Sequence, residues 1–350
     1  MPKAIACIPH VQRMDAHKLE YLRAINYAIN HPFQSEDGRE PSADHTSLTK
    51  ECARLTGIPN WLFTNCCTDA LQIAFHTLCN PGDTVIVPAY GWRAIANAPR
   101  FMGMNVVYCD IDETGNVDLD QLQDLIYKRQ PKAALIVHNF GTVVDVSKIS
   151  AFAKQRGCHL IEDAAPTFTM GEEYSYKLGS HSDAVCFSFD FTKSPGCLGA
   201  GGGLATYNDE LYAKFKTVCS HKSDDNLIGT KSYLDTVAAA VLREDMRIIE
   251  HNRYRTRRVE VATYYLNKMP YKTLPGENYI FHRFIILPDK NEKQNVLNKL
   301  RSEKILAKSV FEPNSFDCQR AVEFYEQAIE LPCHQFVDIN DLNERLQKIL

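Results

Sequence analysis

Short apolar runs alternate with longer amphipathic segments between residues 61 and about 220 of this chain. The apolar runs are five to eight residues long, and segments with helical periodicity follow most of them. Such alternation is typical of βαβ units, so it predicts an α/β fold with a mainly parallel central sheet. The predicted strands cover residues 61–65, 84–90, 106–111, 133–140, 159–163, 184–190 and 203–208.

The pattern changes near residue 235. Residues 234–269 form one long amphipathic segment with helical periodicity, and a single strand-like run at 279–288 follows it. One further helix is predicted near the N-terminus, around residues 16–30. We therefore expect three parts, namely an N-terminal arm and helix (1–40), a large α/β domain (41–238) and a small C-terminal α+β domain (239–350).

Composition and charge are those of a soluble globular protein. The chain has 350 residues, 45% of them hydrophobic and 23% charged, and a formal net charge of −4. A chain with this charge has no overall basic field to attract nucleic acid or anionic lipid. The one basic cluster, "RYRTRR" at 253–258, lies in the long amphipathic segment, and we interpret it as a solvated helix face.

The cysteine pattern favours a reducing compartment. Twelve cysteines occur at irregular spacings without a CxxC pair, which argues against a disulfide framework or a zinc site. The apolar run at the N-terminus is too short for a signal peptide, and no apolar stretch approaches the roughly 20 residues of a membrane span. We expect a cytoplasmic protein with no membrane or nucleic-acid partner.

A glycine-rich stretch, "FSFDFTKSPGCLGAGGG" at 187–203, surrounds Lys193. A dinucleotide-binding GxGxxG motif is disfavoured because Leu204 takes the place of the third glycine and a strand follows. A P-loop is disfavoured because its lysine follows the glycines, whereas Lys193 precedes them. The remaining interpretation is a lysine presented at a strand end for covalent chemistry, with the glycines serving the turn behind it.

Pyridoxal phosphate (PLP) is the cofactor that such a lysine suggests. It needs a lysine for a Schiff base and a carboxylate that keeps its ring nitrogen protonated. Asp163 ends the predicted strand in "HLIEDAAP", where open α/β sheets place their ligands. Thr68 starts a helix whose N–H groups can bind phosphate, Ser188 adds a hydroxyl, and Trp92 can stack on the ring.

Each of these residues also has a simpler interpretation. Asp163 and Thr68 suit ordinary helix or turn caps, and a lone Trp92 is more often a core residue. Their combination is more informative, because successive strand ends would carry a phosphate site, a stacking aromatic, a carboxylate and a lysine in chain order.

The same motifs resemble the DegT/DnrJ/EryC1/StrS group of PLP-dependent sugar aminotransferases. The resemblance lies in "TNCCTDALQIAF", "NPGDTVIVPAYGWRAIANA", "HLIEDAAP" and "FSFDFTKSPGCLGAGGGLATYNDEL", and it extends to the tail "IELPCHQFVDINDLNERLQKIL". It implies the aspartate aminotransferase fold (fold type I) and a homodimer with active sites at the subunit interface.

The resemblance also implies roles for individual residues. Lys193 is similar to the Schiff-base lysine of the group, which favours transamination because dehydratases of the group carry histidine there. Asp163 is similar to the partner of the pyridine nitrogen. The other cofactor-binding positions that match are Cys67, Thr68 and Asp69 at the phosphate-binding helix, the ring-stacking Trp92, and the phosphate-contacting Ser188.

Three departures from the group's pattern stand out. Cys67 replaces the usual glycine before the phosphate-helix threonine. Pro166 replaces a glutamine or histidine that reaches the cofactor's O3′, and its loss would change the pKa of the internal Schiff base. The loop "IGTKSYLD" at 228–235 lacks the asparagine expected to contact the neighbouring subunit's phosphate, so Thr230 or Lys231 would replace it.

The resulting prediction is a ping-pong transfer of an amino group from glutamate to a nucleotide-linked keto sugar in amino-sugar biosynthesis. A 4-keto-6-deoxy sugar is favoured, and the cations facing its diphosphate would come from Arg93, Lys222 or Lys231. Arg93 equally suits an exposed arginine at a helix start.

Alternatives remain in three classes. The first is a 3-keto sugar aminotransferase or another PLP reaction on this fold, such as β-elimination. The second is a regulatory protein that binds PLP or a nucleotide sugar. The glycine pattern makes the third, a nicotinamide oxidoreductase, a distant one.

Overall fold

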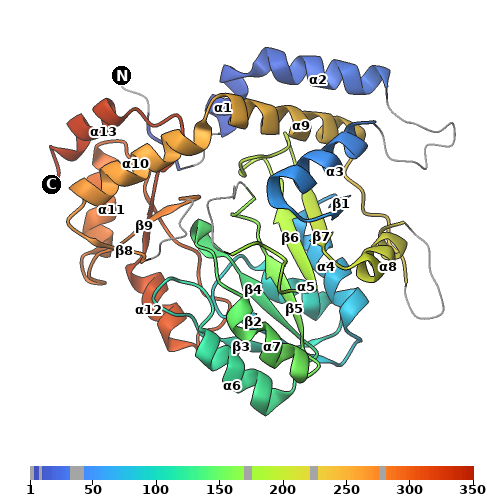
Figure 1. Ribbon diagram of the computed structural model, residues 1–350. Coiled ribbons are helices and arrows are strands. Elements are labelled where there is room, and N and C mark those ends of the chain that lie inside the picture. The colour runs from blue at the N-terminus through green and yellow to red at the C-terminus, as the bar shows by residue number, and fades with distance from the viewer. Residues whose placement is uncertain (1–3, 8–9, 32–42, 169–175, 221–227, 276–280) are drawn as a thin grey trace.

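Two sheets organise the protein. The computed structural model describes residues 4–7, 10–31, 43–168, 176–220, 228–275 and 281–350 (Figure 1). The larger sheet has seven strands in the order β1-β7-β6-β5-β4-β2-β3. Only β7 runs antiparallel to its neighbours, so the predicted mainly parallel sheet is confirmed. The strands are β1 (Asn60–Thr64), β2 (Thr84–Pro88), β3 (Asn105–Cys109), β4 (Ala133–Val137), β5 (His159–Asp163), β6 (Ala184–Ser188) and β7 (Gly202–Thr206).

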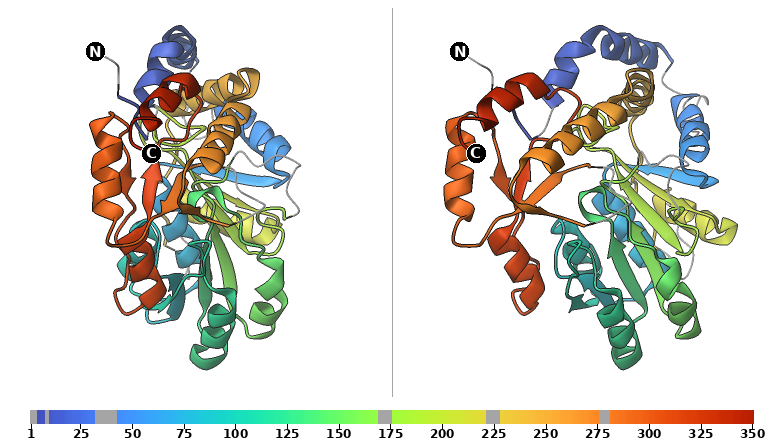
Figure 2. Two further views of the ribbon diagram at one scale, coloured as in Figure 1. Left: turned by 90° about the vertical axis from the view of Figure 1, so that its left-hand side faces the viewer. Right: turned by 60° about the vertical axis from the view of Figure 1, so that its left-hand side comes forward.

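Helices cover both faces of this sheet, because its strands are apolar on both sides. One face packs against α3 (Ala43–Thr56), α6 (Leu119–Arg129), α7 (Ser147–Gln155) and the first half of α9 (Thr236–His251). The other packs against α4 (Cys67–Leu78), α5 (Ala94–Phe101) and α8 (Asp209–Cys219). The predicted α/β layering is thus confirmed, and the two views in Figure 2 show helices on either side of the strands.

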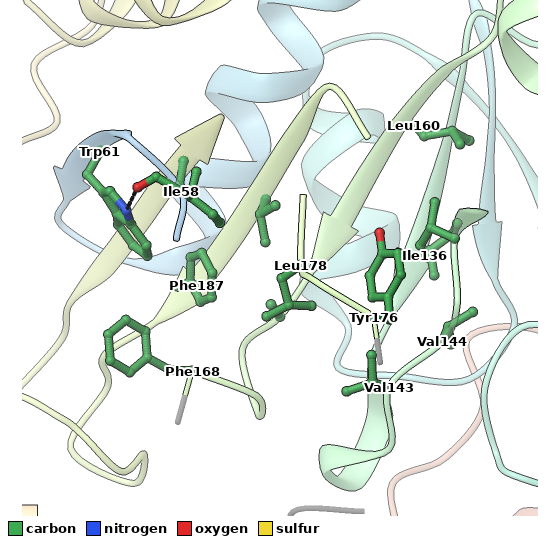
Figure 3. Packing of buried hydrophobic residues seen from close by; sticks show 14 of the residues in the cluster. Ile58, Trp61, Ile136, Val143, Val144, Leu160, Phe168, Tyr176, Leu178 and Phe187 are labelled. Atoms are coloured by element: carbon green, nitrogen blue, oxygen red, sulfur yellow. Dashed lines mark hydrogen bonds between the residues drawn. The ribbon is translucent and has the colours of Figure 1, made fainter. Parts of the chain in front are cut away.

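Aromatic side chains pack together on the first face of the large sheet, next to β6. The Trp61 and Phe187 rings stack with their centroids 4.7 Å apart, and Phe168 meets Phe187 edge-on at 5.7 Å (Figure 3). The Trp61 indole N–H donates a 2.9 Å hydrogen bond to the carbonyl of Ile58. Burial of each such side chain contributes about 1.5–3 kcal/mol, and Phe187 directly precedes Ser188 at the strand end.

The smaller sheet is antiparallel, in the order β10-β11-β9-β8. Its strands are β8 (Lys272–Thr273), β9 (Phe284–Leu287), β10 (Lys308–Ser309) and β11 (Ile329–Leu331). The helices of this part are α10 (Tyr254–Lys268), α11 (Lys293–Ser302), α12 (Gln319–Gln327) and α13 (Ile339–Leu346). A mixed cluster that includes Tyr90, Phe140, Val310 and Phe324 joins the two sheets.

The predicted long helical segment is two helices. Arg253 adopts φ 51° between α9 and α10, which ends one helix and redirects the chain without a glycine or proline. The N-terminal arm likewise carries two helices, α1 (His10–Ala16) and α2 (Lys18–Asn30), where one was predicted. Helix α2 lies along α9 (Figure 1), and Ile5 pairs with Ile305 of the C-terminal part.

The described part of the chain contains no helix that combines the length and the apolarity needed to cross a bilayer.

Candidate active site

A cavity of about 420 Å³ opens where the carboxyl ends of the large sheet's strands face the smaller sheet. This is the edge at which open α/β sheets bind ligands. The structure brings six of the predicted residues together in its lining. These residues are Cys67, Thr68, Trp92, Asp163, Ser188 and Lys193.

Lys193 sits in a compact turn between β6 and β7. Its N–H donates to the carbonyl of Asp190 at 2.8 Å. A Cβ atom on Gly196 would lie 2.5 Å from the Asp190 carbonyl oxygen, and one on Gly202 would lie 2.2 Å from the carbonyl carbon of Cys66. Only glycine fits at these positions, so the turn packs directly against the start of α4. Gly196 thus serves the turn as predicted, whereas a Cβ atom on Gly199 would meet open space.

Arg13 of α1 fixes this turn from the opposite end of the sequence. Its guanidinium donates to the carbonyls of Lys193 (2.7 Å) and Phe191 (3.0 Å) and pairs with Asp245 at 3.2 Å. The buried carboxylate of Asp245 also accepts the Gly196 N–H at 2.8 Å. Sequence reasoning missed this contact, because nothing near residue 13 indicates a partner 180 positions away.

Lys193 and Asp163 both line the cavity, and their charges act on each other's pKa. Burial lowers the pKa of the Lys193 amine, and the positive charge of Arg283 lowers it further, while Asp163 acts in the opposite direction. Burial raises the pKa of Asp163 despite the Ala165 N–H and the nearby Lys193. Each group therefore holds its charge less readily than in water, as at many functional sites.

A buried network positions Asp163. Its Oδ1 atom accepts the Ala165 N–H at 3.0 Å, and its carbonyl accepts the His138 N–H at 3.0 Å. The Val144 N–H donates to His138 Nδ1, so His138 Nε2 carries the proton that it donates to Glu162 at 2.9 Å. These contacts fix the ends of β4 and β5 beside the cavity.

The N-terminus of α4 supplies a second polar element. The first-turn N–H groups of a helix lack intrahelical partners and carry partial positive charge, which suits a phosphate. Cys67 and Thr68 of this turn line the cavity, with Ser188. Burial raises the pKa of the Cys67 thiol well above its ordinary value, so the thiol stays neutral. Asp69 turns away from the lining and accepts the Ser232 hydroxyl at 2.7 Å.

The remaining predicted residues differ in their placement. Trp92 lines the cavity with its side chain 60% exposed and its ring centroid 4.9 Å from that of Phe311. Pro166 also lines the cavity, at the position of the missing glutamine or histidine. Arg93 lies outside the lining and pairs with Glu312 at 2.9 Å, as an exposed arginine at a helix start.

The loop candidates lie outside the lining of the cavity. Lys231 is exposed and pairs through its backbone with Ser220, and neither Lys231 nor Thr230 belongs to the lining. Lys222 lies outside the described residues.

The smaller sheet and the segment before β9 contribute a wall of polar residues that sequence reasoning missed. We call His282, Arg283, Lys308 and Glu330 the C-terminal wall, and Thr68, Asp163, Ser188 and Lys193 the strand-end wall. Arg283 pairs with the buried Glu330, and Lys308 approaches the same carboxylate at 3.5 Å. The only sequence signal was the position of His282 and Arg283 within the strand-like run at 279–288.

The basic cluster at 253–258 corrects a prediction. Arg257 is exposed and pairs with Glu260 at 2.8 Å, as expected of a solvated helix face. Arg258, the last residue of the cluster, is only 8% exposed and points inward beside Lys193. The prediction was wrong for this residue because α10 packs that side of its surface against the body of the protein.

This arrangement fits PLP. The half-buried Lys193, the buried Asp163, the α4 N-terminus and the exposed face of Trp92 provide the amine, carboxylate, phosphate site and aromatic surface that the cofactor needs. Among the described residues, no group of three or more metal-ligating side chains is present.

Comparisons with known proteins agree with this chemistry. The chain is 37% identical over 190 residues to UDP-2-acetamido-2-deoxy-3-oxo-D-glucuronate aminotransferase of Pseudomonas aeruginosa, although that match spans only 52% of each chain. It is 31% identical over 261 residues to a pleiotropic regulatory protein of Geobacillus stearothermophilus, covering 70% of this chain and 68% of that one. It is 29% identical over 279 residues to UDP-N-acetyl-3-dehydro-alpha-D-glucosamine 3-aminotransferase of Acidithiobacillus ferrooxidans, covering 76% and 74%.

The fold has solved counterparts. The crystal structure of NtdA from Bacillus subtilis with bound cofactor PMP superimposes with a TM-score of 0.86 at 21% identity, over all of this chain and 86% of that one. The family model for DegT/DnrJ/EryC1/StrS aminotransferases matches residues 24–345. The chain therefore belongs to the DegT/DnrJ/EryC1/StrS aminotransferase family, whose cofactor is pyridoxal phosphate.

Proposed function

We propose that this protein is an aminotransferase that moves an amino group from glutamate to a keto sugar linked to a nucleotide. The observation that carries the proposal is the meeting of Lys193, Asp163 and the α4 N-terminus in one cavity. PLP bound there supplies an electron sink for the pair of electrons released when the substrate's Cα–H bond breaks.

Lys193 is proposed as the general base and acid. Burial and Arg283 lower the pKa of its amine, so the neutral form is reached at a lower pH than for an ordinary lysine. A neutral amine at this position takes the proton from the substrate Cα and delivers a proton to the carbon that receives the amino group. This role is worth about 10²–10⁴-fold in rate. The Arg13 contacts hold the backbone of the turn while the side chain moves.

Asp163 is proposed to hold a proton on the ring nitrogen of the cofactor. Burial of its carboxylate raises its pKa, and the positive charge of Lys193 offsets this only in part. A positively charged ring nitrogen beside it would reverse that effect and keep the carboxylate ionised. The Ala165 N–H and the His138–Glu162 network orient the carboxylate for this contact.

Borohydride reduction followed by peptide mapping tests the cofactor assignment. We expect a pyridoxyl adduct on Lys193, and an adduct on another lysine or none would contradict it. Addition of glutamate to the PLP form should convert the bound cofactor to its pyridoxamine form, and Lys193→Ala should abolish that conversion. A regulatory protein, the alternative that the Geobacillus relative supports, would show the adduct without glutamate-dependent conversion.

The position of the keto group is the finer part of the proposal. The names of two relatives specify a 3-oxo sugar, which supports amination at C3. The sequence motifs favoured a 4-keto-6-deoxy sugar. A panel of 3-oxo and 4-keto nucleotide sugars, supplied to the pyridoxamine form and followed by product mass, separates the two. Turnover of the 4-keto sugars alone would reject the C3 proposal.

We also propose a homodimer. Helix α2 exposes a set of large apolar side chains, which is uncommon for a helix facing only water; these are Leu19, Leu22 and Ile29. In a dimer, the loop carrying Thr230 and Lys231 would approach the partner's cavity. Light scattering after size-exclusion chromatography should give twice the chain mass of 39.7 kDa. A monomer retaining full activity would contradict this part of the proposal.

A further inference from the structure

Arg258 is a buried cation without a counter-charge. Its side chain is 8% exposed, its Nε atom has no hydrogen-bond partner, and no carboxylate pairs with it among the residues that the structure describes. Burial lowers the pKa of its guanidinium, and the positive charges of Arg283 and Arg13 lower it further. Buried charges in proteins are normally paired, so an unpaired guanidinium indicates a place for an anion.

Other buried arginines around it are paired. Arg13 has Asp245 at 3.2 Å, and Arg283 has Glu330. Each of these two arginines is matched by a carboxylate, although each also has a role at the site. Arg258 is the exception among these neighbours, and it is the one whose charge stays available to a ligand.

A small cavity connects Arg258 with the catalytic lysine. It has room for about one water molecule, and its lining includes Arg258, Lys193, His282 and Arg283. Among its described lining residues there is no aspartate or glutamate. Lys193, His282 and Arg283 also line the main cavity, so the two cavities share this part of their lining.

His282 adds a second polar group without a partner. Its Nε2 atom is buried and makes no hydrogen bond within the described part of the chain. Burial and the positive charges of Lys193 and Arg283 lower its pKa well below the ordinary value, so the imidazole is neutral. A neutral imidazole can place its N–H on Nε2, where it would donate to a carboxylate oxygen held by Arg258.

We propose that Arg258 and His282 form the subsite that binds a carboxylate of the amino donor while its amine lies at Lys193. A carboxylate matches the planar fork of a guanidinium, and it would neutralise the unpaired charge of Arg258. The proposal rests on the proposed aminotransferase function and identifies how the same site selects an acidic donor. The phosphate of the cofactor lies elsewhere, because its site is the α4 N-terminus.

Binding of a non-reacting dicarboxylate tests the subsite without any turnover. Glutarate carries the two carboxylates of glutamate but no amine, and D-glucuronate represents a carboxylate on the sugar. Calorimetry on the full-length PLP-loaded protein should give a glutarate Kd that rises about 10- to 100-fold in Arg258→Met and partly recovers in Arg258→Lys. Arg257→Met, the exposed neighbour on α10, should leave this Kd unchanged.

The outcomes separate the sources of the carboxylate. Loss of glutarate affinity in Arg258→Met supports the amino-donor subsite. A wild-type protein that does not bind glutarate, or an unchanged Kd in Arg258→Met, overturns it. Loss of glucuronate affinity alone overturns the assignment to the donor. Because glutarate cannot be transaminated, these results stand even if the borohydride and half-reaction experiments reject the aminotransferase.

Thermal unfolding distinguishes a binding role from a structural one. Since Arg258 is unpaired, Arg258→Met should not lower the melting temperature of the protein in the absence of anions. Glutarate should raise the melting temperature of the wild type and not that of the variant. A variant that melts well below the wild type without ligand would show that Arg258 serves the fold, and it would overturn the proposal.

Discussion

The two walls of the cavity are built by different means. The residues of the strand-end wall sit at the end of a strand, at the start of a helix or, for Lys193, in the turn that follows β6, so local chain geometry places them at the cavity. The C-terminal wall consists of three charged residues and His282, which come from β10, β11 and the segment entering β9, and Glu330 holds two of them by ion pairs. The first wall depends on local chain geometry, whereas the second depends on ion pairs between segments that are far apart in the sequence.

Arg13 is a further example of a residue that acts through contacts with distant segments of the chain. It belongs to an N-terminal helix, yet it holds the backbone of the Lys193 turn together with Asp245. The lysine therefore belongs to the strand-end wall by position and depends on a distant residue for its fixed backbone. We therefore expect that loss of the Arg13 contacts disturbs the Lys193 turn, although Arg13 belongs to neither wall.

Arg13→Met should give the largest loss of stability. It removes one partner of a buried ion pair and leaves Asp245 with fewer partners, which costs about 3–5 kcal/mol of unfolding free energy. Urea denaturation measures this loss. Lys128→Ala, which breaks an exposed pair on α6, is the matched control and should cost less than about 1 kcal/mol. A similar small loss for Arg13→Met would show that the turn is fixed locally.

Asp163→Asn should give the largest loss of rate attributable to the strand-end wall. Removing one preorganised electrostatic partner of a reacting group typically costs about 10²–10³-fold. The glutamate half-reaction in a single turnover measures it. Asp183→Asn changes a carboxylate at the opposite end of β5, where it pairs with His159, and should leave the rate unchanged. Equal losses in both variants would point to a general structural effect.

The pH dependence of PLP incorporation should show that a charge of the C-terminal wall changes the pKa of Lys193 in the strand-end wall. The lowered pKa of Lys193 means that PLP incorporation into the cofactor-free protein increases with pH and levels off below pH 10.5. Arg283→Leu removes a neighbouring positive charge, so the pKa of Lys193 should rise and the profile should move to higher pH. Stopped-flow absorbance records the profile.

Lys308→Leu is the control for that shift. Lys308 belongs to the same wall, but the charge of Arg283 acts more strongly on the pKa of Lys193. Its profile should stay with the wild type. Profiles that coincide for the wild type and Arg283→Leu would show that the C-terminal wall does not tune the lysine.

Arg93→Ala should give the smallest effect. The Arg93–Glu312 pair is exposed, and such pairs contribute about 0–1 kcal/mol. The KM for the nucleotide sugar should be unchanged, because Arg93 lies outside the lining. A clear rise in KM with unaltered stability would restore the role in substrate binding that the sequence suggested.

The sequence was informative where function coincides with local order. All seven strands of the large sheet were predicted because each is a short apolar run, and Lys193, Asp163, Thr68, Ser188 and Trp92 follow from their places at strand ends. The direction of β7 and the break at Arg253 had no local signal.

The missed residues share a physical cause. In the sequence nothing distinguishes Arg283, Lys308 and Glu330 from other charged residues. Only the folded chain brings the two cations to the Glu330 carboxylate. Arg258 was wrongly assigned to solvent because its neighbours in "RYRTRR" include exposed arginines. Burial of a single residue in a charged helix depends on tertiary packing, which a charge pattern cannot specify.

The pairing of β1 with β7 has a consequence for the order of folding. β1 is an edge strand that pairs only with β7, so Thr64 and Gly202 must meet across most of the large sheet's sequence. The β6–β7 hairpin that carries Lys193 needs only local loop closure, whereas docking of β1 is a contact of high sequence separation. We infer that the lysine turn forms early and that α4 joins it late. A refolding chain should then bind the cofactor only after β1 has paired with β7.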